Sequence, residues 1–211
     1  KWNKGVRDSY LIEITADIYR TADPQVPDGL LLDSVLDRAG QKGTGRWTVK
    51  AALDLGVAIP TIAAAVDARV LSANRERRVE AEAAFGANSN STLESVTVDD
   101  IRSALYASKM ASYSQGFDLL ARASEEYDYG TDLAEVGRIW KAGCIIRAAF
   151  LDRVTAAFQA DPALPLLVLA PTFAEELEAA LPAWRRVVGA ATAAGYPVPA
   201  LSASLAWFDG L

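Results

Sequence analysis

The sequence contains no histidine and a single cysteine, Cys144, among its 211 residues. The absence of histidine excludes a Ser-His-Asp triad, a Cys-His catalytic pair and any metal site built on histidine, and no metal centre is expected. One cysteine cannot form an internal disulfide, and within an apolar stretch it is expected to be a small buried hydrophobe. This cysteine usage fits a reducing compartment, so the cytoplasm is the expected location.

Long apolar runs and an excess of positive charge are also missing. No apolar run approaches the roughly 18 residues that a membrane-spanning helix requires, so no membrane partner is expected. The chain carries 21 basic and 27 acidic residues, which gives a net charge of −6. This balance argues against a general nucleic-acid surface. A binding site for an anion would therefore have to be a local basic pocket in an acidic protein.

The most distinctive run is Gly40-Gln41-Lys42-Gly43-Thr44-Gly45-Arg46-Trp47. Its glycines let backbone N–H groups approach a ligand, while Lys42 adds a positive charge and Thr44 a hydroxyl. The residues from Trp47 onward predict a helix, whose first N–H groups and dipole favour anions. The run therefore predicts a cradle for an oxyanion.

This run has two other interpretations. Four residues separate Gly40 from Gly45, as in a nucleotide-binding P-loop, but Arg46-Trp47 follows where that motif needs Lys-Ser or Lys-Thr. The preceding residues also indicate a short helix, whereas a P-loop follows a buried strand, so a nucleotide site is not expected. The remaining alternative is a glycine-rich connection between helices that carries solvated charges.

Apolar residues recur at helical spacing along most of the chain, which predicts an all-α protein of roughly eight to ten helices. Short alternating runs typical of strands are lacking, and residues 166–169 are the only ambiguous segment. Pro60 is expected to begin a helix that continues towards Phe85, and Thr97-Val98-Asp99-Asp100 resembles a capping box before a long helix. The other helices are predicted over residues 10–18, residues 30–38, residues 47–56, the residues that follow Asp132, a segment from Phe173 to Val188 and a short segment that ends near Gly210.

Three further features concern buried residues. Tyr106, Met110, Tyr113, Phe117 and Leu120 form a stripe at helical spacing, which indicates core packing. Residues 143–151 are very apolar and are predicted to lie at the centre of the molecule. The arginine within them, Arg147, would then need a carboxylate or a ligand as its partner.

Arg69 lies beside Val70 and Leu71, and two interpretations of it remain open. Its aliphatic stem could cover apolar surface while its head reaches water, or its guanidinium could serve a ligand.

The chain is expected to form one all-helical domain over residues 1–211. A faint echo, in which Trp2 precedes Ser9-Tyr10-Leu11 and Trp140 precedes Ala149-Phe150-Leu151, raises the idea of an internal helical duplication.

Taken in order, several runs resemble the C-terminal helical domain of decarboxylating 6-phosphogluconate dehydrogenases, over nearly the whole chain. The glycine run and the Gly-Cys-Ile-Ile-Arg run are the most specific of them. The runs are Asp8-Ser9-Tyr10-Leu11-Ile12-Glu13-Ile14-Thr15, Gly40-Gln41-Lys42-Gly43-Thr44-Gly45-Arg46-Trp47, Ala68-Arg69-Val70-Leu71-Ser72, Tyr113-Ser114-Gln115-Gly116-Phe117, Gly143-Cys144-Ile145-Ile146-Arg147, Trp184-Arg185-Arg186 and Leu205-Ala206-Trp207-Phe208-Asp209-Gly210.

The resemblance implies a function in the pentose phosphate pathway. Members of this family oxidise 6-phosphogluconate with NADP, or in some cases NAD, and release carbon dioxide to give ribulose 5-phosphate. In the family, a lysine and a threonine of the glycine run and the arginine of the Ala-Arg segment hold the substrate phosphate. Those positions match Lys42, Thr44 and Arg69 here. The resemblance also implies a homodimer formed through the helical domain.

The departures from the family pattern limit what this chain does alone. The dinucleotide-binding domain and the catalytic lysine and glutamate would precede Lys1, and a tail that reaches the partner subunit would follow Leu211. Arg46 stands where lysine is common. No catalytic residue is therefore expected in this chain, and by itself it should be inactive.

Two alternatives to the dehydrogenase remain open. One is a stand-alone, non-catalytic helical module that binds a sugar phosphate or only forms a dimer. The other is a different hydroxyacid dehydrogenase, against which the glycine run and Arg69 argue, because small hydroxyacids lack a distal phosphate.

Overall fold

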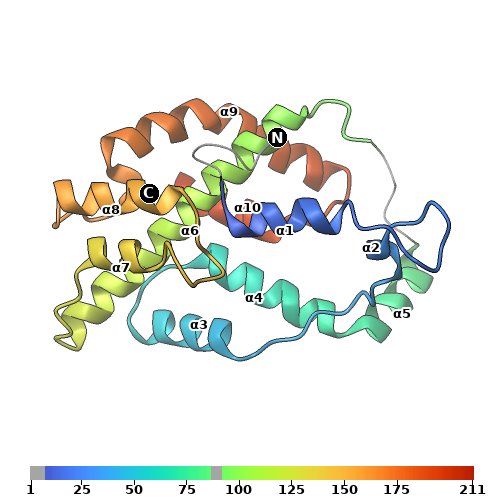
Figure 1. The fold of residues 1–211 in the computed structure, drawn as a ribbon, viewed down its shortest axis with the longest axis horizontal. Coiled ribbons are helices and arrows are strands. Elements are labelled where there is room, and N and C mark those ends of the chain that lie inside the picture. The colour runs from blue at the N-terminus through green and yellow to red at the C-terminus, as the bar shows by residue number, and fades with distance from the viewer. Residues whose placement is uncertain (1–7, 87–91) are drawn as a thin grey trace. The chain divides into compact units, whose positions relative to one another are not determined.

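The computed structural model describes residues 8–86 and 92–211. These residues contain no β-strand, only isolated bridges between Ser9 and Ala148 and between Ala22 and Leu30. The all-α prediction is therefore confirmed, with ten α-helices in the described part of the chain (Figure 1). They are α1 (Tyr10–Ile18), α2 (Leu31–Ser34), α3 (Thr44–Asp54), α4 (Pro60–Ala73), α5 (Arg75–Phe85), α6 (Val98–Glu126), α7 (Leu133–Ile139), α8 (Phe150–Ala160), α9 (Pro171–Ala193) and α10 (Pro199–Asp209), with a 3-10 turn, η2 (Leu167–Leu169), before α9.

The helices group into two compact units. The first takes in the chain up to Asp37 together with Thr131–Leu164, and the second comprises Arg38–Gly130 and Pro165–Leu211. The single domain over residues 1–211 stays a prediction. The internal duplication finds no support in this fold, and Trp2, on which it partly rested, lies outside the described residues.

In the first unit, α7 packs against α8. Gly137 permits this close approach, because a Cβ atom at its position would lie 2.9 Å from Oγ1 of Thr155. The start of α1 is tied to the segment before α8, since Tyr10 N donates to the carbonyl of Arg147 at 3.2 Å and Ala149 N donates to Asp8 at 2.9 Å.

Arg147 finds a different partner from either of those expected. Its guanidinium lies 3.8 Å from the centroid of the Tyr10 ring, and Nη1 donates to the carbonyl of Cys144 at 3.4 Å. An aromatic face therefore takes the place of the predicted carboxylate, since the π electrons of the ring attract a cation. The predicted central position of residues 143–151 is wrong for the first part of that stretch: Ile145 is 62% exposed, whereas Phe150 and Leu151 are fully buried.

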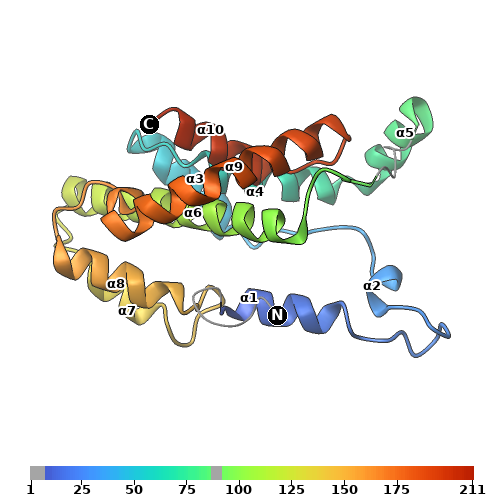
Figure 2. The ribbon, with the colours of Figure 1, turned by 90° about the horizontal axis from the view of Figure 1, so that it is seen from above.

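In the second unit, the long helix α6 forms the core with α9 packed along it (Figures 1 and 2). Within the predicted stripe, Tyr106, Met110 and Phe117 are buried, while Tyr113 and Leu120 are half-buried. The stripe is thus confirmed as core packing. Helix α10 completes the unit by packing against α4 and α6.

A buried amide connects α6 to the start of α4. Gln115 is fully buried, and its Oε1 accepts from Thr61 N at 3.0 Å while its Nε2 donates to Thr61 Oγ1 at 2.8 Å. Pro60 begins α4 as predicted, and no side chain of the N-cap residue Ile59 caps this end. Gln115 therefore satisfies a helix N–H group that would otherwise be buried without a partner.

Two predicted helices end earlier than expected. Asn74 has non-helical dihedral angles (φ −93°, ψ 63°), which split the helix predicted between Pro60 and Phe85 into α4 and α5. Of the helix predicted over residues 30–38, only the four residues of α2 are helical. The ambiguous segment 166–169 contains the 3-10 turn η2, not a strand.

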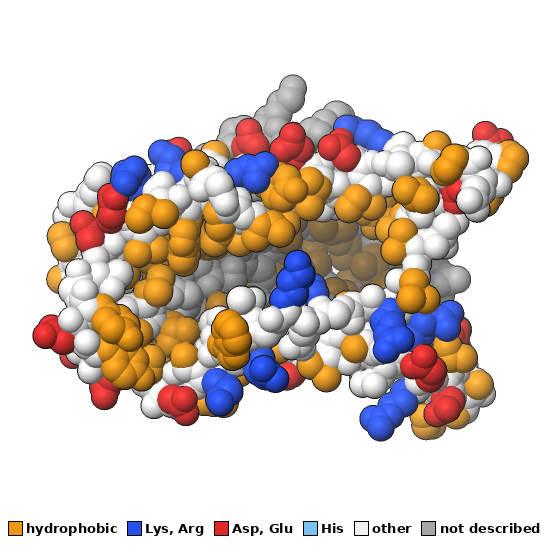
Figure 3. Space-filling model, turned by 60° about the horizontal axis from the view of Figure 1, so that its bottom comes forward, with side chains coloured by type: hydrophobic (Ala, Val, Ile, Leu, Met, Phe, Trp, Pro, Cys, Tyr) orange, Lys and Arg blue, Asp and Glu red, His pale blue; other side chains and the backbone are white. Residues whose placement is uncertain are grey.

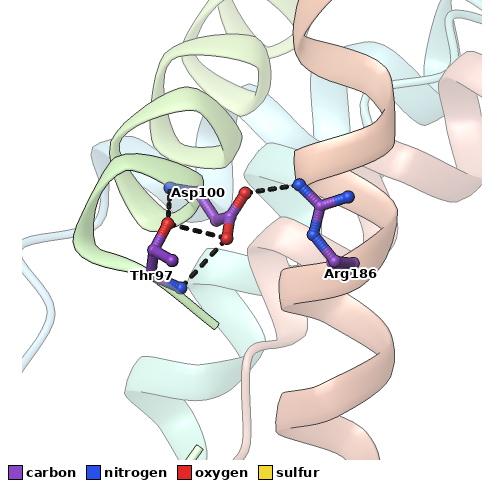
Figure 4. A network of polar contacts seen from close by, with 3 residues as sticks. All are labelled: Thr97, Asp100 and Arg186. Atoms are coloured by element: carbon purple, nitrogen blue, oxygen red, sulfur yellow. Dashed lines mark hydrogen bonds and ion pairs between the residues drawn. The ribbon is translucent and has the colours of Figure 1, made fainter. Parts of the chain in front are cut away.

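The predicted capping box at the start of α6 is confirmed (Figure 4). Asp100 N donates to Thr97 Oγ1 at 3.1 Å, and Thr97 N donates to a carboxylate oxygen of Asp100 at 2.9 Å. The other carboxylate oxygen accepts from Nη2 of Arg186 on α9 at 2.5 Å. Hydrogen bonds from Arg186 and then from Thr97 lower the pKa of Asp100 to about 2.

Replacement of Asp100 by asparagine is expected to change the acid unfolding of the protein. A carboxylate whose pKa is depressed in the folded state stabilises it above the ordinary value near 4, and this contribution disappears as the pH falls towards 2. The melting temperature of Asp100→Asn should therefore lie below that of the wild type at pH 6, and the gap should close between about pH 4 and pH 2. Thermal unfolding followed by circular dichroism across this range measures the gap. A gap that stays constant down to pH 2 contradicts the assignment, and Glu178→Gln on the exposed face of α9 serves as the control.

Candidate functional site

The predicted cradle sits where the chain enters α3. Gly43 is the N-cap residue of this helix, and its φ of 103° lies in the region that favours glycine. It offers no side chain to cap the helix, so the first N–H groups of α3 have no capping partner from that residue. The predicted helix after the glycine run, and its end near Gly56, are confirmed.

The segment before α3 lies along α4, as Figure 1 shows. Three hydrogen bonds hold it there. Ala39 N donates to Ser72 Oγ at 3.1 Å, Nη2 of Arg69 donates to the carbonyl of Gly40, and Nε2 of Gln41 donates to the carbonyl of Val66 at 3.4 Å. The Arg69 contact brings a guanidinium from α4 to the glycine run, although 29 residues separate it from Gly40.

The three predicted site residues are all exposed. Lys42 lies in the glycine run, Thr44 is the first residue of α3, and Arg69 lies one turn before the end of α4. The structure brings Arg69 to the run through Gly40, and among the described residues no ion pair engages Lys42 or Arg69. Both interpretations of Arg69, a solvated guanidinium and a ligand contact, remain open. The structure adds that a backbone carbonyl, that of Gly40, orients the guanidinium. The role of all three residues in binding phosphate stays a prediction.

Val66, Ser72 and Gly45 hold the run in place, a role that their sequence context did not predict. Val66, Arg69 and Ser72 are spaced by three residues, so they share one face of α4. Gly45 faces them, since a Cβ atom at its position would lie 2.8 Å from Cγ2 of Val66. The three-residue spacing was visible in the sequence, but nothing there showed that this face meets the glycine run.

Burial shifts the pKa values of Lys109 and Asp118, which lie in the middle of α6. Burial lowers the pKa of Lys109 to about 8 and raises the pKa of Asp118. Because desolvation is the cause of each shift, these residues mark poorly hydrated positions on α6 and not a coupled acid–base pair. Within the described ranges, no group of three cysteine, aspartate or glutamate residues is arranged to hold a metal ion.

The surface is mixed in character, and Figure 3 shows apolar, basic and acidic side chains distributed over one face of the molecule. Several large apolar side chains are exposed, among them Trp47 and Leu53 of α3 and Phe85 of α5. Exposed apolar area of this kind often takes part in contacts with other protein surfaces. None of the described helices has the length and hydrophobicity needed to cross a membrane.

Comparison with known proteins identifies relatives over the whole chain. The family model "6-phosphogluconate dehydrogenase, C-terminal domain" matches residues 1–211. The decarboxylating 6-phosphogluconate dehydrogenase of Synechococcus elongatus is 51% identical over 212 residues, which cover 99% of this chain and 45% of that protein. A chloroplastic decarboxylating 6-phosphogluconate dehydrogenase of Arabidopsis thaliana is 47% identical over 218 residues, with the same coverage.

A solved structure shares the fold. The 6-phosphogluconate dehydrogenase of Plasmodium falciparum, studied in its apo form, with its cofactor NADP+ and with its substrate 6-phosphogluconate, superimposes with a TM-score of 0.92. It is 43% identical in sequence, and the match covers 99% of this chain and 45% of that one. The chain therefore spans somewhat less than half the length of the relatives that it matches.

Proposed function

The chain belongs to the 6-phosphogluconate dehydrogenase family, whose C-terminal domain it matches from end to end, and we propose that it binds the substrate phosphate of an enzyme that oxidatively decarboxylates 6-phosphogluconate to ribulose 5-phosphate. The observation that carries this proposal is the contact between Arg69 and the carbonyl of Gly40, which brings a guanidinium to the glycine run that holds Lys42 and Thr44.

The chemistry of these groups suits a phosphate dianion. Arginine presents several N–H donors in a planar fork, so one of them can bond to Gly40 while others face a ligand. Lys42 supplies a compact positive charge, and Thr44 supplies a hydroxyl and its backbone N–H at the start of α3. A helix N-terminus that lacks a capping side chain adds further donors. Together these groups offer charge and directed hydrogen bonds to the same anion.

Holding a phosphate contributes to catalysis although no bond to it changes. Oxidation and decarboxylation of 6-phosphogluconate occur at carbons remote from the phosphate, and the binding energy of the remote group orients the reacting carbons. The residues of this chain therefore anchor and orient the substrate. Proton transfers in the reaction are assigned to residues that precede Lys1 in the family pattern.

NADP is the proposed cofactor, and the described residues do not themselves form a site for it. The glycine run does not fit the dinucleotide fingerprint Gly-x-Gly-x-x-Gly, because Thr48 stands where the third glycine would be, and the run follows a loop and not a strand. The cofactor would be held by residues outside this chain, and the choice between NADP and NAD would be made there.

We also propose that the native protein is a homodimer in the cytoplasm. The exposed apolar side chains of α3, Trp47 and Leu53, support an additional protein contact, and the single cysteine is compatible with a reducing compartment. Sedimentation of the native polypeptide checks the dimer.

The proposal is tested by assaying the full-length native polypeptide and the isolated chain of residues 1–211 side by side. The full-length polypeptide should reduce NADP in the presence of 6-phosphogluconate and release carbon dioxide, which absorbance at the NADPH band and trapping of the gas would show. The isolated chain should reduce no NADP, because it lacks the groups that move the proton and hold the cofactor. A full-length polypeptide that binds 6-phosphogluconate without oxidising it would favour the non-catalytic module. Failure to bind 6-phosphogluconate at all would overturn the proposal.

A further inference from the structure

We infer that Ser72 and Gly45 are positioning residues, which hold the glycine run at a fixed position along α4 so that Lys42 and Arg69 converge on one phosphate. This inference rests on the proposed function, since it concerns the geometry of the same anion site. Neither residue is expected to touch the substrate.

The contacts that α4 makes with the glycine run all lie on one face of the helix. The side chain or carbonyl of every third residue, Val66, Arg69 and Ser72, meets the glycine run or the residue before it. Residues three apart lie on the same face of a helix, about one turn from each other. One face of α4 therefore both presents Arg69 and holds the segment that carries Lys42.

Ser72 joins three segments of the chain through its hydrogen bonds. Its Oγ accepts the backbone N–H of Ala39 at 3.1 Å, and its carbonyl accepts Nη2 of Arg78 on α5 at 3.2 Å. Ser72 is half-buried, so its hydroxyl is partly shielded from water, which would otherwise compete for the Ala39 donor. Ala39 directly precedes Gly40, so this bond also fixes the position of the Gly40 carbonyl, which orients Arg69.

Gly45 has no space for a side chain beside Val66. A Cβ atom here would lie 2.8 Å from Cγ2 of Val66, closer than such atoms can approach. Gly45 is in the first turn of α3, where φ is ordinary for a helix and alanine would otherwise favour the helix. Glycine therefore permits the close approach of α3 to α4, whereas an added Cβ atom would force Val66 or one of the helices to shift.

The test compares four variants of the full-length native enzyme and measures the affinity for 6-phosphogluconate together with the KM for NADP. Ser72→Ala removes the acceptor for Ala39 and should raise the Kd and KM for 6-phosphogluconate about threefold to tenfold, the range of a single hydrogen bond. Ser72→Thr keeps the hydroxyl and should restore most of this loss. Gly45→Ala should raise the same constants about tenfold or more through overpacking, and Val66→Ala in that background should recover affinity by removing the methyl group in the way.

A merely structural role would give a different pattern. It would lower kcat and the melting temperature and change both KM values together, whereas a positioning role confines the change to 6-phosphogluconate and to inorganic phosphate used as a competing probe. Unchanged affinity in Ser72→Ala and Gly45→Ala, together with weakened binding in Lys42→Ala, would overturn this inference and leave the proposed phosphate site intact. Unchanged affinity in Ser72→Ala, Gly45→Ala and Lys42→Ala alike would overturn the proposed site and the inference with it. Loss of affinity that Ser72→Thr and Val66→Ala repair would support the inference.

Discussion

Replacement of Lys42 or Arg69 by alanine is expected to weaken the binding of 6-phosphogluconate by about 1.5–3 kcal/mol each, the scale of a hydrogen bond to a charged group. Each substitution removes one positively charged donor that would bind the phosphate dianion. Because both side chains are exposed, neither substitution leaves a buried charge unpaired in the fold. Calorimetric titration of the full-length polypeptide measures the loss. Since the lost terms are electrostatic, the difference between wild type and variant should shrink as the ionic strength rises.

Matched controls separate the site from general charge. Lys50 lies on the exposed surface of α3 and Arg77 on that of α5. Lys50→Ala and Arg77→Ala therefore remove the same kinds of charge outside the proposed phosphate site. These two variants should bind 6-phosphogluconate within about twofold of the wild type, because exposed charges at a distance are screened by salt. If a control loses as much affinity as Lys42→Ala or Arg69→Ala, the effect belongs to net charge and the assignment of that site residue fails.

Replacement of Phe117 by alanine should destabilise the fold by about 3–5 kcal/mol, the range for emptying a large aromatic site in a packed core. Phe117 is 1% exposed on α6, the helix that α9 packs along. The substitution loses the transfer energy of the ring and leaves a cavity that neighbouring side chains fill only in part. Chemical denaturation of the native polypeptide, followed by circular dichroism, measures the change in the free energy of unfolding.

Phe85 provides the control for this prediction, because it is also a helical phenylalanine but is 90% exposed on α5. Phe85→Ala should change the free energy of unfolding by less than about 0.5 kcal/mol, as surface substitutions generally do. Equal destabilisation by the two substitutions would show that Phe117 does not pack in the core as described.

Much of the helical architecture follows from short-range signals. Pro60 begins a helix because its missing N–H group and fixed φ suit the first turn. Thr97 and Asp100 form the predicted capping box because their spacing alone lets each side chain reach the other's backbone N–H group. Departures from the prediction arose where a single residue adopts an unexpected backbone conformation, as at Asn74, which ends α4 without proline or glycine.

The contacts of Arg69 and Arg147 could be identified only from the fold. Arg147 was expected to require a carboxylate or a ligand, yet it lies over the ring of Tyr10, which is distant in sequence. Arg69 could be judged only from its apolar neighbours in the chain, whereas its guanidinium is bound to Gly40. Periodicity shows which face of a helix is apolar, but it does not identify the segment that will lie against a polar group.

The sequence by itself determined the helical class, the family and the chemical groups available for a phosphate. Periodicity, capping residues and motifs all depend on residues that lie close together in the chain. Only the tertiary structure decided that one face of α4 carries Val66, Arg69 and Ser72 against the glycine run. The bond between Ala39 and Ser72 joins residues 33 positions apart, and its formation depends on how α3 and α4 pack. The residue types at an anion site are therefore local information, whereas their convergence is a property of packing.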